Sequence, residues 1–120
     1  MEDFQMRDYQ SPAPSRQYKA IFAQSSTDAP TATILYNSVS PAAAPVIARG
    51  GAGSYTLTIS GATWGAAATN FFAVLTCNGA AAVGKVVRTS STVLTLTFTD
   101  AATPSAADSG AFSLDVQIFE

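Results

Sequence analysis

Reactive side chains are scarce in this chain of 120 residues. The sequence has no histidine, which is the commonest general base and the commonest metal ligand in proteins. A serine or threonine nucleophile would therefore need a lysine or a carboxylate as its base. The lysines are Lys19 and Lys85, and Lys85 is expected to point to solvent from a strand that also contains Val86 and Val87. We expect no catalytic residue and no enzymatic activity.

The acidic side chains are dispersed along the sequence. Asp28 and Asp108 lie in turn sequences, where an aspartate bonds nearby backbone N–H groups. Asp100 ends a predicted strand, and Asp115 should face outward from the last one. A calcium site gathers several oxygen ligands in one loop, and after residue 8 no loop holds more than one carboxylate. The sequence therefore predicts no bound metal.

Two segments invite a ligand-binding interpretation. Residues 49–54 are glycine-rich, but they lack the Lys-Ser/Thr ending of a phosphate loop and lead into a predicted strand, so a hairpin loop explains them and we expect no cofactor. Trp64 and Tyr36 form a sugar-stacking platform if Trp64 is exposed; the other interpretation places Trp64 in the core or in an interface. The single Cys77 excludes an internal disulfide and is interpreted as a small buried hydrophobe.

Alternating apolar and polar residues predict β-strands from residue 17 onward. Leu94, Leu96 and Phe98, for example, alternate with threonines, as in a strand buried on one face. Turn-forming residues separate such runs at intervals of roughly ten residues, without long amphipathic helices. The pattern predicts an all-β fold, an antiparallel two-sheet β-sandwich of about eight strands, Ig-like or jelly-roll-like. The predicted strands are residues 17–24, 31–37, 44–48, 55–60, 71–77, 83–89, 94–99 and 112–118.

One strand pairing follows from a turn motif. Asn78-Gly79 lies between two apolar runs, and Asn-Gly is the strongest short-range signal for a β-hairpin. We therefore expect residues 71–76 to pair antiparallel with residues 83–89.

The first sixteen residues differ from the remainder. Six of the fourteen charged residues lie among residues 1–20, and Pro12 and Pro14 favour an extended path. We interpret residues 1–16 as an extended N-terminal arm and residues 17–120 as the sandwich domain. The arm contains too few large side chains to form a core. Its predicted partner-binding residues are the apolar Phe4, Met6 and Tyr9 and the basic Arg7 and Arg16.

Charge limits the possible partners. The net charge of −2 argues against nucleic acid, whose phosphates select clustered lysine and arginine. The sequence has no long apolar run and its first residues do not resemble a signal peptide, so we expect no membrane association. A domain with so few charges tolerates close neighbours, and its threonine-rich strands at 56–60 and 95–99 would be adhesive as unpaired edges. We expect a homo-oligomer, with a trimer favoured.

Part of the sequence resembles a family of viral proteins. Residues 18–37, YKAIFAQSSTDAPTATILYN, resemble an opening seen in small β-rich virion structural proteins of tailed bacteriophages: a YKA strand, a Q-S-x-T-x-A-P turn and a second strand ending in Asn. The segment GSYTLT at 53–58 fits the same pattern. The sequence departs from it at Ser26, where glycine is common. The resemblance implies a virion as the setting and carries no catalytic residue.

Composition and resemblance lead to the same hypothesis. We expect a non-enzymatic bacteriophage structural protein, a capsid decoration or head-fibre protein located in the virion after assembly in the host cytoplasm. Its arm would contact other virion proteins, either capsid or fibre subunits. The alternative is a carbohydrate- or receptor-binding module of a phage fibre, which predicts an exposed Trp64.

Overall fold

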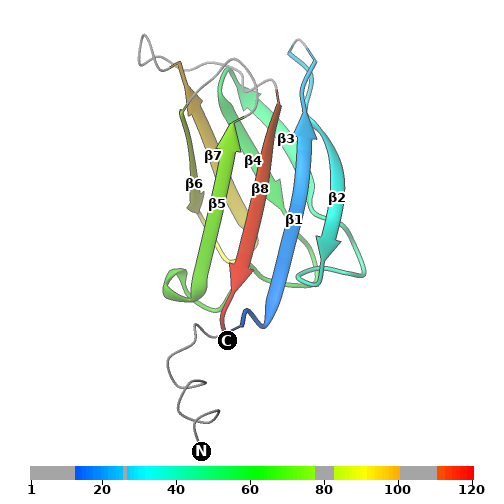
Figure 1. The fold of residues 1–120 in the computed structure, drawn as a ribbon, viewed down its shortest axis with the longest axis vertical. Helices are drawn as coiled ribbons and strands as arrows, with labels where there is room; N and C mark the ends of the chain where they lie inside the picture. Colours follow the sequence, from blue (N-terminus) through cyan, green and yellow to red (C-terminus); the bar gives the residue numbers. More distant parts are fainter. Residues whose placement is uncertain (1–12, 26, 78–82, 101–110) are drawn as a thin grey trace, which may run out of the picture.

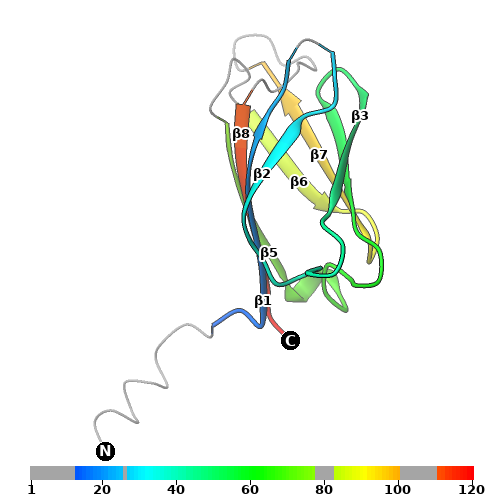
Figure 2. The ribbon, with the colours of Figure 1, turned by 90° about the vertical axis from the view of Figure 1, so that its right-hand side faces the viewer.

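The computed structural model describes residues 13–25, 27–77, 83–100 and 111–120, which form a β-sandwich. Two four-stranded antiparallel sheets pack face to face (Figures 1 and 2), so the predicted all-β, two-sheet architecture is confirmed. Sheet A contains, in spatial order, β2 (Thr31–Asn37), β1 (Arg16–Ala23), β8 (Ala111–Ile118) and β5 (Phe71–Cys77). Sheet B contains β3 (Val46–Gly51), β4 (Ser54–Thr58), β7 (Val93–Thr99) and β6 (Val83–Arg88), and one 3-10 turn, η1 (Ala68–Asn70), precedes β5.

Alternation of side chains builds the core. In β8 every second residue is buried, and β4 and β7 follow the same rule. The inward residues of both sheets form one apolar cluster between the sheets. Its largest buried side chains are Trp64, Tyr18, Tyr55, Phe22, Phe98 and Phe112.

Aromatic contacts join the two sheets near one end of the sandwich. Phe22 of β1 stacks on Phe112 of β8 with ring centroids 4.7 Å apart, and Phe98 of β7 lies 4.9 Å from Phe112 across the core. Tyr55 of β4 meets Phe98 edge to face, and its hydroxyl donates a 2.5 Å hydrogen bond to Gln24 Oε1. These rings lock the relative position of the sheets, because offset and edge-to-face pairs stabilise beyond the area that they bury.

The first and last strands are the two central strands of sheet A. β1 pairs with β8 along its whole length, from Arg16 opposite Ile118 to Ala23 opposite Ala111. Ser15 extends the contact, because its N–H and its hydroxyl both donate to the Ile118 carbonyl, at 2.8 and 2.9 Å. The beginning of β1 therefore lies beside the C-terminal end of the domain (Figure 1).

The predicted hairpin between residues 71–76 and 83–89 is wrong. β5 pairs with β8 in sheet A, whereas β6 pairs with β7 in sheet B. A two-residue Asn-Gly turn joins strands that are two residues apart, but β5 and β6 are separated by five residues, 78–82, which is long enough to pass from one sheet to the other. The predicted Asn78-Gly79 turn lies outside the described residues.

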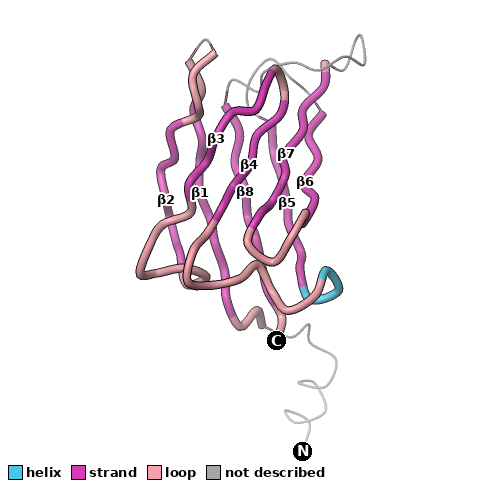
Figure 3. The backbone as a smooth tube through the Cα atoms, turned by 180° about the vertical axis from the view of Figure 1, so that it is seen from behind, coloured by secondary structure: helices cyan, strands magenta, loops and turns pink. Residues whose placement is uncertain are grey.

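The threonine-rich strands lie inside sheet B and are not edge strands. β4 and β7 are the two interior strands of sheet B, which faces the viewer in Figure 3. Both edges of each strand are paired, β4 with β3 and β7, and β7 with β4 and β6. The threonines consequently form part of a sheet face and present no adhesive edge.

A glycine allows the sheets to approach where the sandwich closes. Gly84 of β6 lies opposite Phe98 of β7 and faces Leu75 of β5. A Cβ atom at position 84 would contact Leu75 Cδ2 and would lie 3.0 Å from Phe98 Cε2, closer than ordinary packing permits.

We expect Gly84→Ala to lower the free energy of unfolding by about 1–3 kcal/mol, because the added methyl overfills this contact. Gly50→Ala in β3 is the matched control, since the nearest atoms to its Cβ would be 3.9 Å away, and it should change stability by less than about 0.5 kcal/mol. Urea denaturation measures both variants, and equal losses would contradict the close approach at Gly84.

Candidate interaction surface

The described charged residues are dispersed over the sandwich. Lys85 is exposed on the outer face of sheet B, as predicted, and Asp28 is exposed in the turn before β2. Among the described residues, no three Cys, Asp or Glu side chains lie close enough to hold a metal ion. No helix in the same residues is long and apolar enough to cross a membrane.

Of the five residues predicted to bind a partner, the structure describes one. Phe4, Met6, Arg7 and Tyr9 lie outside the described residues. Arg16 is the first residue of β1, and its guanidinium interacts within the domain.

The Arg16 side chain spans two segments at the end of the sandwich. Its Nε and Nη2 donate to Glu120 Oε1 at 3.1 and 2.9 Å, and its Nη1 donates to the Thr63 carbonyl at 2.8 Å. These bonds tie the start of β1 to the end of the chain and to the loop after β4. Arg16 thus contributes to the closure of the domain.

Trp64 is fully buried, with 0% of its surface exposed. Its ring meets Tyr18 edge to face at a centroid distance of 5.8 Å, inside the core. Tyr36, by contrast, is exposed on β2. The sugar-stacking platform of Trp64 and Tyr36 is therefore wrong, and the core interpretation of Trp64 is confirmed. Flanking Gly61 and Gly65 have positive φ values of 75° and 94°, which allow the loop to turn the indole inward.

Two arginines hold the backbone on either side of the indole. Arg88, the last residue of β6, donates from Nε to the Trp64 carbonyl at 3.2 Å and from Nη2 to the Gly65 carbonyl at 2.7 Å. Arg16 binds the preceding carbonyl, that of Thr63. The backbone N–H of Trp64 donates to the Ser91 carbonyl at 2.7 Å. One loop is therefore bonded to both sheets, and Trp64 closes the core at this end.

Two polar atoms in this part of the core lack partners. Tyr18 Oη and Trp64 Nε1 are buried, and neither has a hydrogen-bond partner among the described residues. Burial raises the pKa of the Tyr18 phenol to about 12, because the anion would lose its hydration. Burial also raises the pKa of the Cys77 thiol, which packs partly against the core at the end of β5.

The outward surface of sheet A, which we call the A face, is apolar at both edges. Phe72 and Val74 of β5 are 54% and 47% exposed, and Leu35 and Tyr36 of β2 are 61% and 53% exposed. Ile21 of β1 lies between these edges. An apolar group of this kind on a small domain is typical of a contact site.

Strand register places one pair of opposite charges at the centre of the A face. Lys19 of β1 lies directly opposite Asp115 of β8. Tyr36 is opposite Lys19 on the outer side, and Val74 is opposite Asp115 on the other. These four residues form one row across the sheet, which we call the charged row: Tyr36, Lys19, Asp115 and Val74.

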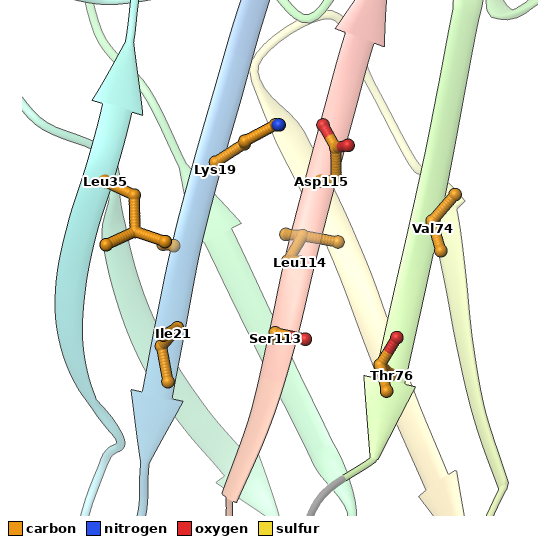
Figure 4. A pocket seen from close by; sticks show the side chains of 9 residues that line it. Lys19, Ile21, Leu35, Val74, Thr76, Ser113, Leu114 and Asp115 are labelled. Atoms are coloured by element: carbon orange, nitrogen blue, oxygen red, sulfur yellow. The ribbon is translucent and has the colours of Figure 1, made fainter.

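A bulge in β2 brings an additional side chain onto the A face. The β1–β2 register shifts between Lys19 and Ala20, which leaves Leu35 as an extra residue. Leu35 borders a shallow depression of about 300 Å³ together with residues of β1, β8 and β5. Figure 4 shows the depression from outside, with the side chains of Lys19, Ile21, Ser113, Asp115, Val74 and Thr76 projecting from three neighbouring strands.

The outer face of sheet B has a different chemistry. Its two interior strands present threonines, with Thr56 opposite Thr95 and Ser54 opposite Thr97. Lys85 of the edge strand β6 lies opposite Thr97. The centre of this face is therefore rich in hydroxyls, and its edge strands add exposed valines, Val46 of β3 and Val83 and Val87 of β6.

Sequence reasoning missed the A face, although one signal was present. Residues 71–77, FFAVLTC, form an almost continuous apolar run, unlike the alternating strands β7 and β8. Such a run is typical of a strand with apolar side chains on both faces. β5 is an edge strand whose outward face has no described cover, so Phe72 and Val74 are exposed.

The sequence matches no protein-family model, and no curated protein or solved structure shows significant similarity to it.

We expect Arg88→Ala to lower the free energy of unfolding by about 1.5–3 kcal/mol, because two partly buried carbonyls lose charged donors. Lys85→Ala, on the same strand but exposed, is the control and should change stability by less than about 0.5 kcal/mol. Chemical denaturation followed by the fluorescence of Trp64, the single tryptophan, measures both. Equal effects would contradict the role of Arg88.

Stability should also depend on the protonation of Tyr18. The folded state keeps the Tyr18 phenol protonated, because its folded pKa of about 12 exceeds its ordinary value of 10.0. The stability that depends on this protonation is fully present below pH 10 and is lost as the pH rises toward 12. By pH 12 the wild type should lose roughly 2–3 kcal/mol more than Tyr18→Phe. At pH 7 the two should agree within about 1 kcal/mol, since the hydroxyl has no described partner. Urea titrations across this range measure the difference, and identical pH profiles would contradict it.

Proposed function

We propose that this protein is a non-enzymatic structural subunit of a bacteriophage virion, a capsid-surface decoration or head-fibre protein that attaches through its N-terminal residues. It would contact capsid or fibre subunits and assemble as a homo-oligomer. The resemblance of residues 18–37 to phage proteins supports the assignment to a virion. The architecture of the domain supports a structural role.

The observation that carries the proposal is where the folded domain begins. Its eight described strands form both sheets and their core starting from Arg16. Ser15 is bonded to Ile118, so the described chain begins beside the end of β8. Phe4, Met6 and Tyr9 precede the eight described strands in the sequence, so these side chains are available in our proposal as an anchor to another protein.

The chemistry of the domain supports an architectural role. Ser113 and Lys19 line the same depression, so they are a hydroxyl and an amine that come near each other. No hydrogen bond joins them among the described contacts, and the depression lies on an open sheet face. A nucleophile needs a base within hydrogen-bond reach and a site that limits water. The surroundings of Ser113 supply neither.

Removal of residues 1–12 tests the anchor. We expect the truncated protein to keep the melting temperature of the full chain within about 3 °C, because the described bonds at Ser15 and Arg16 remain. Particles purified by density gradient from a phage-producing culture that expresses either form should contain the full chain in many copies. They should contain at least tenfold less of the truncated chain, as measured by quantitative mass spectrometry.

Point variants distinguish the effect of the predicted anchor side chains from the effect of shortening the N-terminal segment. Replacing Phe4, Met6 and Tyr9 together by serine should lower incorporation as much as truncation does, whereas Glu2→Gln with Asp3→Asn should leave it unchanged. Full incorporation of the truncated protein would refute the anchor, and absence of the full chain from all particles would refute the virion assignment.

A further inference from the structure

We propose that the A face is a self-complementary interface that binds the A face of a second copy of this chain about a two-fold axis. The axis would run parallel to the strands, above the line between β1 and β8. This inference concerns the sandwich alone and is independent of the virion assignment.

The order of strands in sheet A suits such an axis. The order β2-β1-β8-β5 places β1 and β8 at the centre and β2 and β5 at the edges. Rotation by 180° therefore lays β1 of one copy over β8 of the other, and β2 over β5. Two facing sheets with nearly aligned strands are the ordinary packing of β-sandwiches.

The charged row is complementary to itself under this rotation. Lys19 and Asp115 are in register, at the same height along the strands, so each lysine of one copy lies over the aspartate of the other. The exposed Lys19 has no described ion pair within its own chain. Asp115 Oδ1 accepts a 3.1 Å hydrogen bond from Gln17 Nε2, which holds the carboxylate on the face. Two intermolecular ion pairs result, and charges so placed select one register.

Apolar and shape complementarity follow from the same rotation. Tyr36 of one copy meets Val74 of the other, because these residues end the charged row at its two edges. In the neighbouring row Ile21 is opposite Ser113, so the rotation sets a large side chain over a small one. Leu35, raised by the bulge, lies over the β5 edge. The exposed aliphatic and aromatic groups of both copies are thereby covered.

The size of the A face fits a weak but specific contact. Four strands spaced about 4.8 Å apart and seven residues long at about 3.3 Å each give roughly 450 Å² per copy, or about 900–1,000 Å² in total. That area is near the lower limit for a specific interface. The predicted association is therefore weak and reversible, as is typical of small interfaces.

Reversal of the charges tests the proposal. Analytical ultracentrifugation of the full chain between 5 and 500 µM should show a monomer–dimer equilibrium that weakens with salt. Lys19→Asp alone and Asp115→Lys alone should each weaken dimerisation at least tenfold, because like charges then face each other across the axis. Mixing these two single variants should restore a dimer, now a heterodimer, because every facing pair is again of opposite sign.

The control is Lys85→Asp, which makes the same charge change on the outer face of sheet B and should leave dimerisation unchanged. Thermal melts confirm that each variant is folded. Removal of residues 1–12 should also leave the dimer intact, which separates this interface from the anchor. A wild-type monomer at 500 µM, a trimer, single variants that dimerise like wild type, or a mixture that stays monomeric would each overturn the proposal.

Discussion

The antiparallel pairing of the first strand with the last one is the contact on which the remaining structure depends. β1 and β8 are the centre of sheet A, and each carries one edge strand, β2 on one side and β5 on the other. Their inward residues Phe22 and Phe112 stack and meet Phe98 of sheet B, so the pairing also fixes how the sheets face each other. Because the paired residues are about a hundred positions apart in sequence, closing the loop between them is entropically unfavourable. Burial of the inward apolar side chains offsets this entropy loss.

The positions of the strands could be predicted from the sequence, because the alternation of apolar and polar residues is a local property. β2 and β5 have the predicted bounds, and β1 differs by one residue at each end. Which strands pair with each other could not be predicted in the same way, since strand pairing depends on which strand edges remain free after the core forms. The Asn-Gly signal at 78–79 pointed to a local hairpin, whereas Gly84 packs against Leu75 across the gap between two sheets. Likewise, nothing local indicates that Lys19 and Asp115 are neighbours, because only the β1–β8 register brings them together.

The two outer faces of the sandwich differ in their chemistry. Sheet B presents hydroxyls on its two interior strands and exposed valines on its edge strands, whereas the A face presents aliphatic and aromatic groups around one pair of opposite charges, Lys19 and Asp115. At the end of the domain, Arg16 and Arg88 hold the Trp64 loop from both sheets, and β1 begins there. In our two proposals, attachment uses the N-terminal residues and self-association uses the A face, so the two roles are assigned to different parts of the protein.

The position of β8 also bears on synthesis of the protein in the cell. Until β8 has emerged from the ribosome, sheet A lacks one of its two central strands, and β1 lacks the neighbour whose Phe112 stacks on Phe22. The hairpins β1–β2 and β3–β4 can form early in translation, but sheet A is complete only after β8 has been synthesised. A nascent chain keeps apolar surface of sheet A in water until then, and chaperones that shield such surface would act on it before the finished domain exists.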